Sequence, residues 1–167
     1  MRDGCRTMLR LGLATALVVA ILDQTSKALV LAHFASRALG TNTLTPFFNL
    51  VLTLNHGISF GLFNAVQGSG VGVNAFLFSL VAAVIVAGLI YWLSRVANPL
   101  LAFAIGLVIG GAIGNIADRI RHGAVVDFLD FHIGAYHWPA FNLADSAICV
   151  GVALMLFDSL LLRREAH

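Results

Sequence analysis

Two aspartates, Asp127 and Asp145, have the type and setting that acid–base chemistry needs. On one continuous helix they would lie about 27 Å apart. Gly134 and Pro139 stand between them, however, and these helix breakers permit the chain to turn back so that the carboxylates face each other. A close pair of carboxylates does not easily ionise twice, so one keeps a proton near neutral pH while the other acts as a base toward water. Such a pair hydrolyses amides without a metal ion or a nucleophilic side chain, and it titrates as one unit.

Further polar residues are placed where they could support this chemistry. The stretch GNIADRIRHGAVVDFLDF, residues 114–131, follows a long apolar run and is rich in charge. Its charged residues are Asp118, Arg119, Arg121, Asp127 and Asp130. Asp23 and Lys27 lie one helical turn apart, at the favourable acid-to-base spacing. Charged groups inside apolar segments usually mark functional sites. Three amides could orient the acids or a peptide: Asn55, Asn115 and Asn142.

Parts of this pattern are also compatible with roles other than catalysis. From spacing alone, Asp127 is equally well assigned as a loop carboxylate and Asp145 as an acid at a helix N-terminus, where the helix dipole favours it. Asp118 and Arg119 could likewise form an interfacial helix end. A proton-coupled membrane carrier could use the acids as a relay, and a non-catalytic subunit could assemble through a glycine-rich helix face. The acids gather at one level, however, and no path of charged residues crosses the apolar segments.

Other catalytic classes lack their motifs. A zinc protease would require H-E-x-x-H, which does not occur, and His132 and His137 are wrongly spaced for one helical face. The sequence Gly68-Ser69-Gly70 is typical of a flexible loop end and not of a serine nucleophile. The net charge of +2 provides no basic patch for nucleic acid. We expect no metal ion and no cofactor.

The composition predicts that the acids are positioned by membrane helices. The chain has 167 residues, of which 59% are hydrophobic and 11% charged, whereas a soluble domain carries about 25% charge. No charged residue occurs between Arg37 and Arg95 or between Arg95 and Asp118. A bilayer span needs about 20 apolar residues. We therefore expect a single integral membrane domain over residues 1–167, with spans near 9–31, 71–93, 99–117 and 143–162.

The distribution of basic residues predicts the orientation. Four spans put both termini on one side, together with Arg95, and this side carries more Lys and Arg than the other. The positive-inside rule makes it cytoplasmic. The ends of the spans that carry the clustered acids then face outward. Asp158, about 20 Å further along the last span than Asp145, is expected to be a solvated residue at the inner end.

The outer segments near 32–70 and 122–140 contain candidate strands. FFNLVLTLN alternates and is rich in β-formers, and GISFGLF after His56-Gly57 suggests a hairpin with it; VVDFLDFHI is a further strand. The expected fold is thus an all-α membrane protein of four transmembrane helices with a small extracytoplasmic β-sheet. Such a sheet could hold an extended peptide as an added strand. Gly106, Gly110 and Gly114 repeat every fourth residue, which favours close helix packing.

Four motifs, taken in order, resemble the lipoprotein signal peptidases, or type II signal peptidases. They are DQTSK at residues 23–27, NHG at 55–57, GNIADRIRHGAVVDF at 114–128 and FNLAD at 141–145, so the resemblance covers nearly the whole chain. After NHG the family usually continues with two small residues, where this chain has Ile58-Ser59. This departure bears on the shape of the outer loop and on substrate preference.

The resemblance implies an aspartic endopeptidase of the bacterial inner membrane, with Asp127 and Asp145 as its catalytic pair. It places supporting or substrate-binding roles on Asp23, Lys27, Asn55, Asn115, Asp118, Arg119 and Asn142. The implied substrate is a prolipoprotein, cleaved just before a cysteine that already carries diacylglycerol. The membrane lipid and this substrate are the expected partners, and we expect a monomer.

Overall fold

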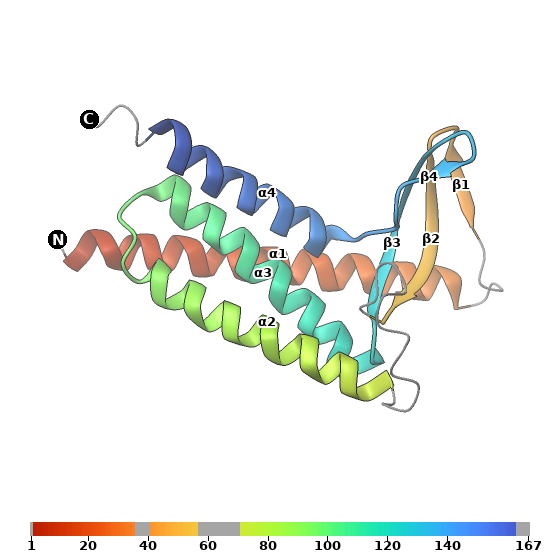
Figure 1. The fold of residues 1–167 in the computed structure, drawn as a ribbon, viewed down its shortest axis with the longest axis horizontal. Coiled ribbons are helices and arrows are strands. Elements are labelled where there is room, and N and C mark those ends of the chain that lie inside the picture. Colours follow the sequence, from red (N-terminus) through yellow and green to blue (C-terminus); the bar gives the residue numbers. More distant parts are fainter. Residues whose placement is uncertain (1, 36–40, 57–70, 163–167) are drawn as a thin grey trace.

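The computed structural model describes residues 2–35, 41–56 and 71–162. It contains four long helices that run beside one another, with the start of α1 and the end of α4 at the same end of the bundle (Figure 1). Their bounds are α1 Arg2–Phe34, α2 Val71–Leu93, α3 Pro99–His122 and α4 Leu143–Phe157, which a short π-helix, η1 Asp158–Leu162, continues. All four are long and apolar enough to cross a membrane. The predicted class, four membrane helices with a small sheet, is confirmed.

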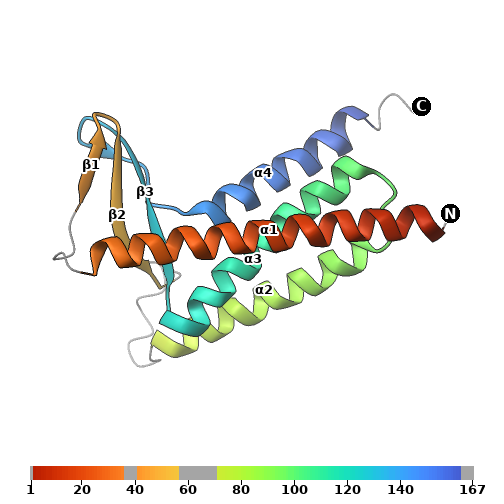
Figure 2. The same ribbon diagram turned by 180° about the vertical axis from the view of Figure 1, so that it is seen from behind.

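The sheet lies at the opposite end of the bundle and projects past α4 (Figures 1 and 2). Its strands are antiparallel and follow the chain order: β1 Asn42–Thr45, β2 Phe48–Asn55, β3 Val125–Ile133 and β4 Tyr136–His137. The stretch VVDFLDFHI forms β3 as predicted. The partner suggested for β2, residues 57–63, lies outside the described residues, and the observed partners of β2 are β1 and β3.

The third helix, α3, is longer than predicted because its end signals lie further along the chain. It begins at the cap residue Asn98, whose Oδ1 accepts the Leu100 N–H at 2.9 Å, and Pro99 occupies the first turn. It ends at Gly123, whose φ of 70° only glycine adopts readily. The expected end near residue 117 is therefore too early, and Asp118 and Arg119 lie on the last turns of the helix.

The prediction that Asp158 is solvated is wrong. Its side chain is buried, with 4% exposed, and it accepts a hydrogen bond from Nδ2 of Asn98 at 2.5 Å. Asn98 uses its oxygen to cap α3, so its amide nitrogen is left to pair with a carboxylate across the helix boundary. Asp158, which directly follows α4, therefore ties the C-terminal end of that helix to the start of α3.

The central helix of the bundle is α3. In its most apolar stretch 61% of the residues are buried, against 6–17% in the corresponding stretches of the other three helices. Glycines allow the neighbouring helices to pack this closely. A Cβ on Gly110 would lie 2.6 Å from the Ala16 carbonyl oxygen of α1, and one on Gly151 of α4 would lie 2.7 Å from the Ala104 carbonyl oxygen. The helix backbones therefore approach too closely for a side chain. The C-terminal end of α1 packs on the sheet through Val30, Phe34 and Phe128.

Substituting alanine for Gly110 is expected to destabilise the protein by about 1–3 kcal/mol, because the new methyl group meets the α1 backbone and the helices must move apart. Thermal unfolding in detergent would measure the effect. Gly88→Ala on α2 is the matched control, since nothing lies within 4 Å of the added atom. Equal unfolding temperatures for the two variants would contradict the close packing.

Candidate active site

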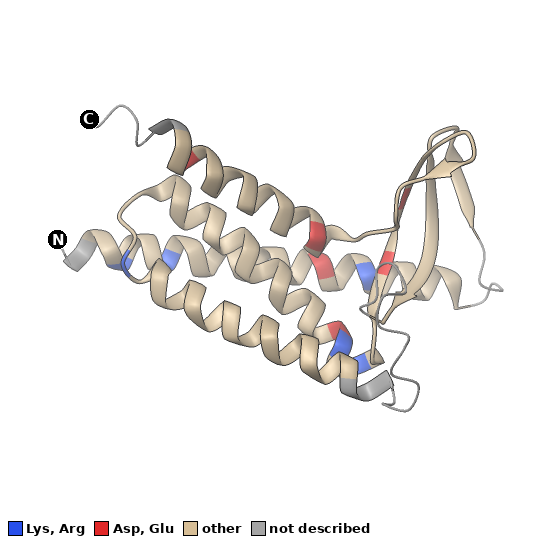
Figure 3. Ribbon diagram, in the orientation of Figure 1, with Lys and Arg blue, Asp and Glu red and all other residues tan. Residues whose placement is uncertain are grey.

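Charged residues gather where the helices meet the sheet (Figure 3). The structure brings the residues singled out from the sequence together from five elements. They are Asp23 and Lys27 of α1, Asn55 of β2, Asn115, Asp118 and Arg119 of α3, Asp127 of β3, and Asn142 and Asp145 at the start of α4.

A buried lysine lies between two carboxylates at the base of the site. Nζ of Lys27 is 2.8 Å from Oδ2 of Asp23 and 2.8 Å from Oδ2 of Asp118. It also donates to Oδ1 of Asn115 at 3.1 Å. The three charged side chains are at most 2% exposed, so solvent does not screen their attraction. This ion cluster joins α1 to α3 and fixes the oxygen of the Asn115 amide.

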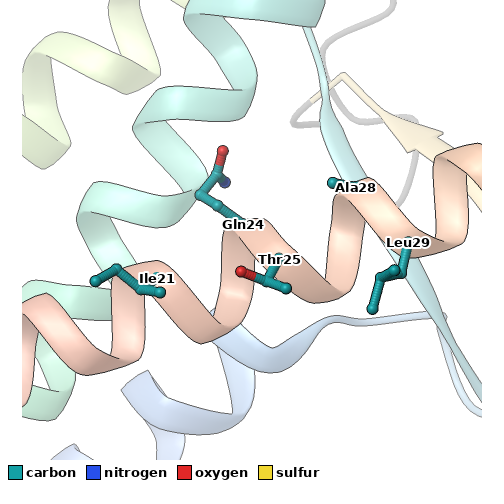
Figure 4. A pocket seen from close by; sticks show the side chains of 5 residues that line it. All are labelled: Ile21, Gln24, Thr25, Ala28 and Leu29. Carbon is teal, nitrogen blue, oxygen red and sulfur yellow. The ribbon is translucent and has the colours of Figure 1, made fainter.

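Sequence reasoning missed Gln24, which stands inside the DQTSK motif. Its Nε2 lies 2.8 Å from Oδ1 of Asp118 and 3.1 Å from the Gly114 carbonyl oxygen, and its Oε1 accepts from Arg121. An amide between the charged residues of an apolar helix is the signal that could have identified it. Gln24 also lines a pocket of about 480 Å³ on the face of α1 (Figure 4). The other lining residues are Ile21, Thr25, Ala28 and Leu29.

The start of α4 holds Asp145 in a fixed position. Asn142 caps the helix, since its Oδ1 accepts the Asp145 N–H at 2.9 Å, and Oδ2 of Asp145 accepts the Asn142 N–H at 3.2 Å in return. The next turn is tied to α1, because Oδ1 of Asp23 accepts the Ala144 N–H at 3.0 Å. The FNLAD motif therefore forms a capping box that orients one carboxylate.

Two asparagine amides connect Asp127 with Asp145. Nδ2 of Asn142 donates to Oδ1 of Asp127 at 2.7 Å, and Nδ2 of Asn115 donates to Oδ1 of Asp145 at 2.8 Å. The two amides meet where Nδ2 of Asn142 lies 3.3 Å from Oδ1 of Asn115. We call this connection the amide bridge. The return of the chain expected from Gly134 and Pro139 thus brings the two acids into one hydrogen-bonded network.

The Asp127 carboxyl group is the more enclosed of the two, with 2% of the residue exposed on β3, whereas Asp145 is half-buried. Burial is the main cause that raises the pKa of Asp127 to about 6, and the charge of Asp145 acts in the same direction. Hydrogen bonds from Asn55, at 3.0 Å, and from Asn142 oppose the rise, as does the charge of Lys27. Asp127 therefore exchanges its proton within reach of neutral pH.

Arg119 lies at the edge of this network. Its Nη1 donates to the Asn115 carbonyl oxygen of its own helix at 3.4 Å, and the guanidinium carbon is 5.8 Å from the centre of the Phe78 ring on α2. The charge is therefore directed toward α2. Within the part of the chain that the structure describes, no three His, Cys, Asp or Glu side chains are grouped to hold a metal ion.

Comparisons with known proteins identify the family of the chain. The family model described as "Signal peptidase (SPase) II" matches residues 15–161. The chain is 45% identical to a lipoprotein signal peptidase of Burkholderia mallei (strain SAVP1), over 89% of this chain and 86% of that protein. It is 44% identical to the one of Paraburkholderia phymatum, with the same coverage.

A solved structure shares the fold. A bacterial membrane enzyme determined by the in meso method at 1.9 Å resolution superposes with a TM-score of 0.74 at 30% identity, over 90% of this chain and 92% of that one. A second structure, at 2.3 Å, gives a TM-score of 0.71 over 89% of each chain. The fold, the matched residues and these relatives together show that the chain belongs to the signal peptidase II family.

Proposed function

We propose that this chain is an aspartic endopeptidase that removes the signal peptide from diacylglyceryl-modified prolipoproteins, cleaving on the N-terminal side of the lipid-modified cysteine. The observation that carries the proposal is the amide bridge between Asp127 and Asp145. It holds two carboxyl groups from different elements in one network at the end of four membrane helices. The lipoprotein signal peptidases that the chain resembles support the same substrate class.

In the proposed mechanism Asp145 acts first as the base and Asp127 as the acid. Asp145 takes a proton from a water molecule, whose oxygen attacks the scissile carbonyl carbon, while Asp127 donates its proton to the carbonyl oxygen. The tetrahedral intermediate then collapses. The C–N bond breaks, the leaving nitrogen receives the proton held by Asp145, and Asp127 regains a proton from the intermediate's hydroxyl group. The raised pKa of Asp127 suits the acid role, since the group keeps its proton up to a pH of about 6, well above the range of an ordinary aspartate.

The membrane arrangement suits a lipid-bearing substrate. We propose a monomer in the bacterial inner membrane with both termini in the cytoplasm and the site at the outer edge of the bilayer. The substrate's acyl chains can then stay in the membrane while its scissile amide reaches water. Arg6, Arg10 and Arg95 on the inner side support this orientation.

The carrier alternative is not favoured. The charged groups of the site cluster at the sheet end of the bundle (Figure 3). Asp158, the acid at the inner end, is occupied in tying α4 to α3. A carrier would need a series of polar groups from one side to the other.

Cleavage of a diacylglyceryl-modified prolipoprotein by the purified protein in lipid tests the proposed function. We expect a product whose N-terminus is the lipid-modified cysteine, and a rate that chelators leave unchanged. The same prolipoprotein without its lipid is the control, and it should be cleaved much more slowly. Equal rates for both forms would overturn the proposed substrate class, and a rate abolished by chelators would overturn the aspartic mechanism.

The pH dependence of kcat/KM should follow the proton on Asp127. Because the acid must be protonated, activity is expected to fall as the pH rises through about 6, the pKa of this group. Asn55→Ala removes a hydrogen bond that lowers the pKa of Asp127, so the fall in kcat/KM should occur at a higher pH. Thr43→Ala on exposed β1 is the control and should leave the pH of this fall unchanged. A fall in kcat/KM that occurs at a lower pH in Asn55→Ala than in the unmodified protein would contradict this role of Asp127.

A further inference from the structure

The far end of the sheet carries an apolar surface that the catalytic network does not use. We call it the aromatic tip, and it surrounds a shallow pocket of about 410 Å³. It consists of Phe47, Phe131, His132, Ile133, Tyr136 and Trp138. Ile133 is 84% exposed, Tyr136 70% and Trp138 60%, which is far more than a water-exposed hairpin normally presents in large apolar side chains.

The chain around the tip is also free of charge. Neither residues 41–56 nor residues 131–138 include any Asp, Glu, Lys or Arg. The nearest carboxylate, Asp130, is only 7% exposed, lies 2.9 Å from Nδ1 of His137 and accepts Nδ2 of Asn49 at 2.8 Å. Strand edges that face water are commonly protected by charged side chains. The tip therefore lacks the charged side chains that a water-exposed strand edge usually carries.

The position of the tip indicates what covers it. Both hairpin turns of the sheet project past the side of α4 at the end of the bundle, as the two opposite views show (Figures 1 and 2). The side of α4 is itself apolar and exposed, with Val150 at 52% and Leu156 at 56%. Since α4 is long and apolar enough to cross a bilayer, we expect lipid to cover this exposed side. The tip consequently overhangs the lipid beside α4.

We propose that the aromatic tip inserts into the headgroup region of the bilayer beside α4 and anchors the sheet to the membrane surface. Tyrosine and tryptophan have an apolar ring and one polar group, and they favour this region of a bilayer. Tyr136 and Trp138 supply such rings, and Ile133 and Phe47 supply apolar area that reaches toward the acyl chains. The anchor holds β3, and with it Asp127, at a fixed height above the membrane.

Fluorescence of Trp138 in lipid nanodiscs tests the anchor without any activity measurement. The chain has two tryptophans, so Trp92→Phe leaves Trp138 as the only reporter. We expect strong quenching by lipids brominated close to the headgroup, weaker quenching by lipids brominated at the chain end, and little quenching by acrylamide. Trp138→Phe leaves Trp92 of α2 as the only tryptophan. Its fluorescence reports the opposite interface and shows how strongly brominated lipids quench a tryptophan on a membrane helix.

Ile133→Asp in the Trp92→Phe background should shift Trp138 emission to the red and restore acrylamide quenching. Leu54→Asp is its matched control, because Leu54 is also exposed on the sheet but pairs with Val126 at the other end of β3. It should leave the Trp138 signal unchanged. Quenching of Trp138 by acrylamide and not by brominated lipid would overturn the proposal and show that the tip faces water or a soluble partner. Trp138 emission that responds equally to both aspartates would overturn it as well.

Discussion

Replacing either Asp127 or Asp145 by asparagine is expected to abolish cleavage of a lipid-modified prolipoprotein. An amide neither takes a proton from water nor gives one to the scissile carbonyl, so each variant removes one half of the acid–base pair. Loss of one such role typically lowers the rate by about 10²–10⁴-fold. Initial rates of the purified variants in lipid, followed by the mass of the released signal peptide, would measure the effect.

The comparison needs a variant that perturbs the same region without touching the pair. Asp130→Asn serves, because Asp130 lies on the same strand as Asp127 and its carboxylate pairs with Asn49 and His137 outside the site. It should keep most of the activity. Near-normal turnover by Asp127→Asn or Asp145→Asn would mean that the carboxylates have a structural role and that another group performs the chemistry.

Lys27→Met is expected to lower the free energy of unfolding by about 3–5 kcal/mol, because it leaves Asp23 and Asp118 buried without their shared cation. The loss of its hydrogen bond also frees the Asn115 amide that supports Asp145. Unfolding temperatures in detergent would report the stability, and the cleavage assay the effect on the site.

Asp118→Asn is the control for the Lys27 prediction. It leaves Asp23 and Lys27 as a one-to-one pair, so the buried charges still balance. This variant should unfold at a clearly higher temperature than Lys27→Met. The reverse order would show that the hydrogen bonds to Asp118 from Gln24 and from the Val126 backbone matter more than the charge of Lys27.

Much of the fold follows from local patterns. An uncharged, largely apolar run gives α2 its bounds, and the apolar and aromatic stretch VVDFLDFHI gives β3 its bounds. The predicted end of α3 is too early because the apolar run stops before the helix does, while the true stop signal is the positive φ of Gly123. The burial of Asp158 depends on Asn98, a residue remote in sequence, and no local pattern reveals that contact.

The site, like the fold, is only partly predictable from the sequence. Motif order indicates which acids and amides come together, since each motif lies near the end of an apolar segment. The pairing within the site could not be read from the sequence. The amide bridge depends on which nitrogen of Asn115 and Asn142 meets which oxygen, and that is fixed only when α3, α4 and β3 have packed. The hydrogen bonds of Gln24 were missed for the same reason.

The Asp23–Lys27 pair has a consequence for the biogenesis of the protein. The first helix leaves the ribosome before α3 exists, so its two charges must enter the membrane without Asp118. Because they lie one turn apart on the same helix, with Nζ 2.8 Å from the carboxylate, each can neutralise the other during insertion. Asp118 is synthesised only later, with the last turns of α3. The order of synthesis therefore exposes neither charge of α1 to the lipid without its partner, although the finished ion cluster contains three charged side chains.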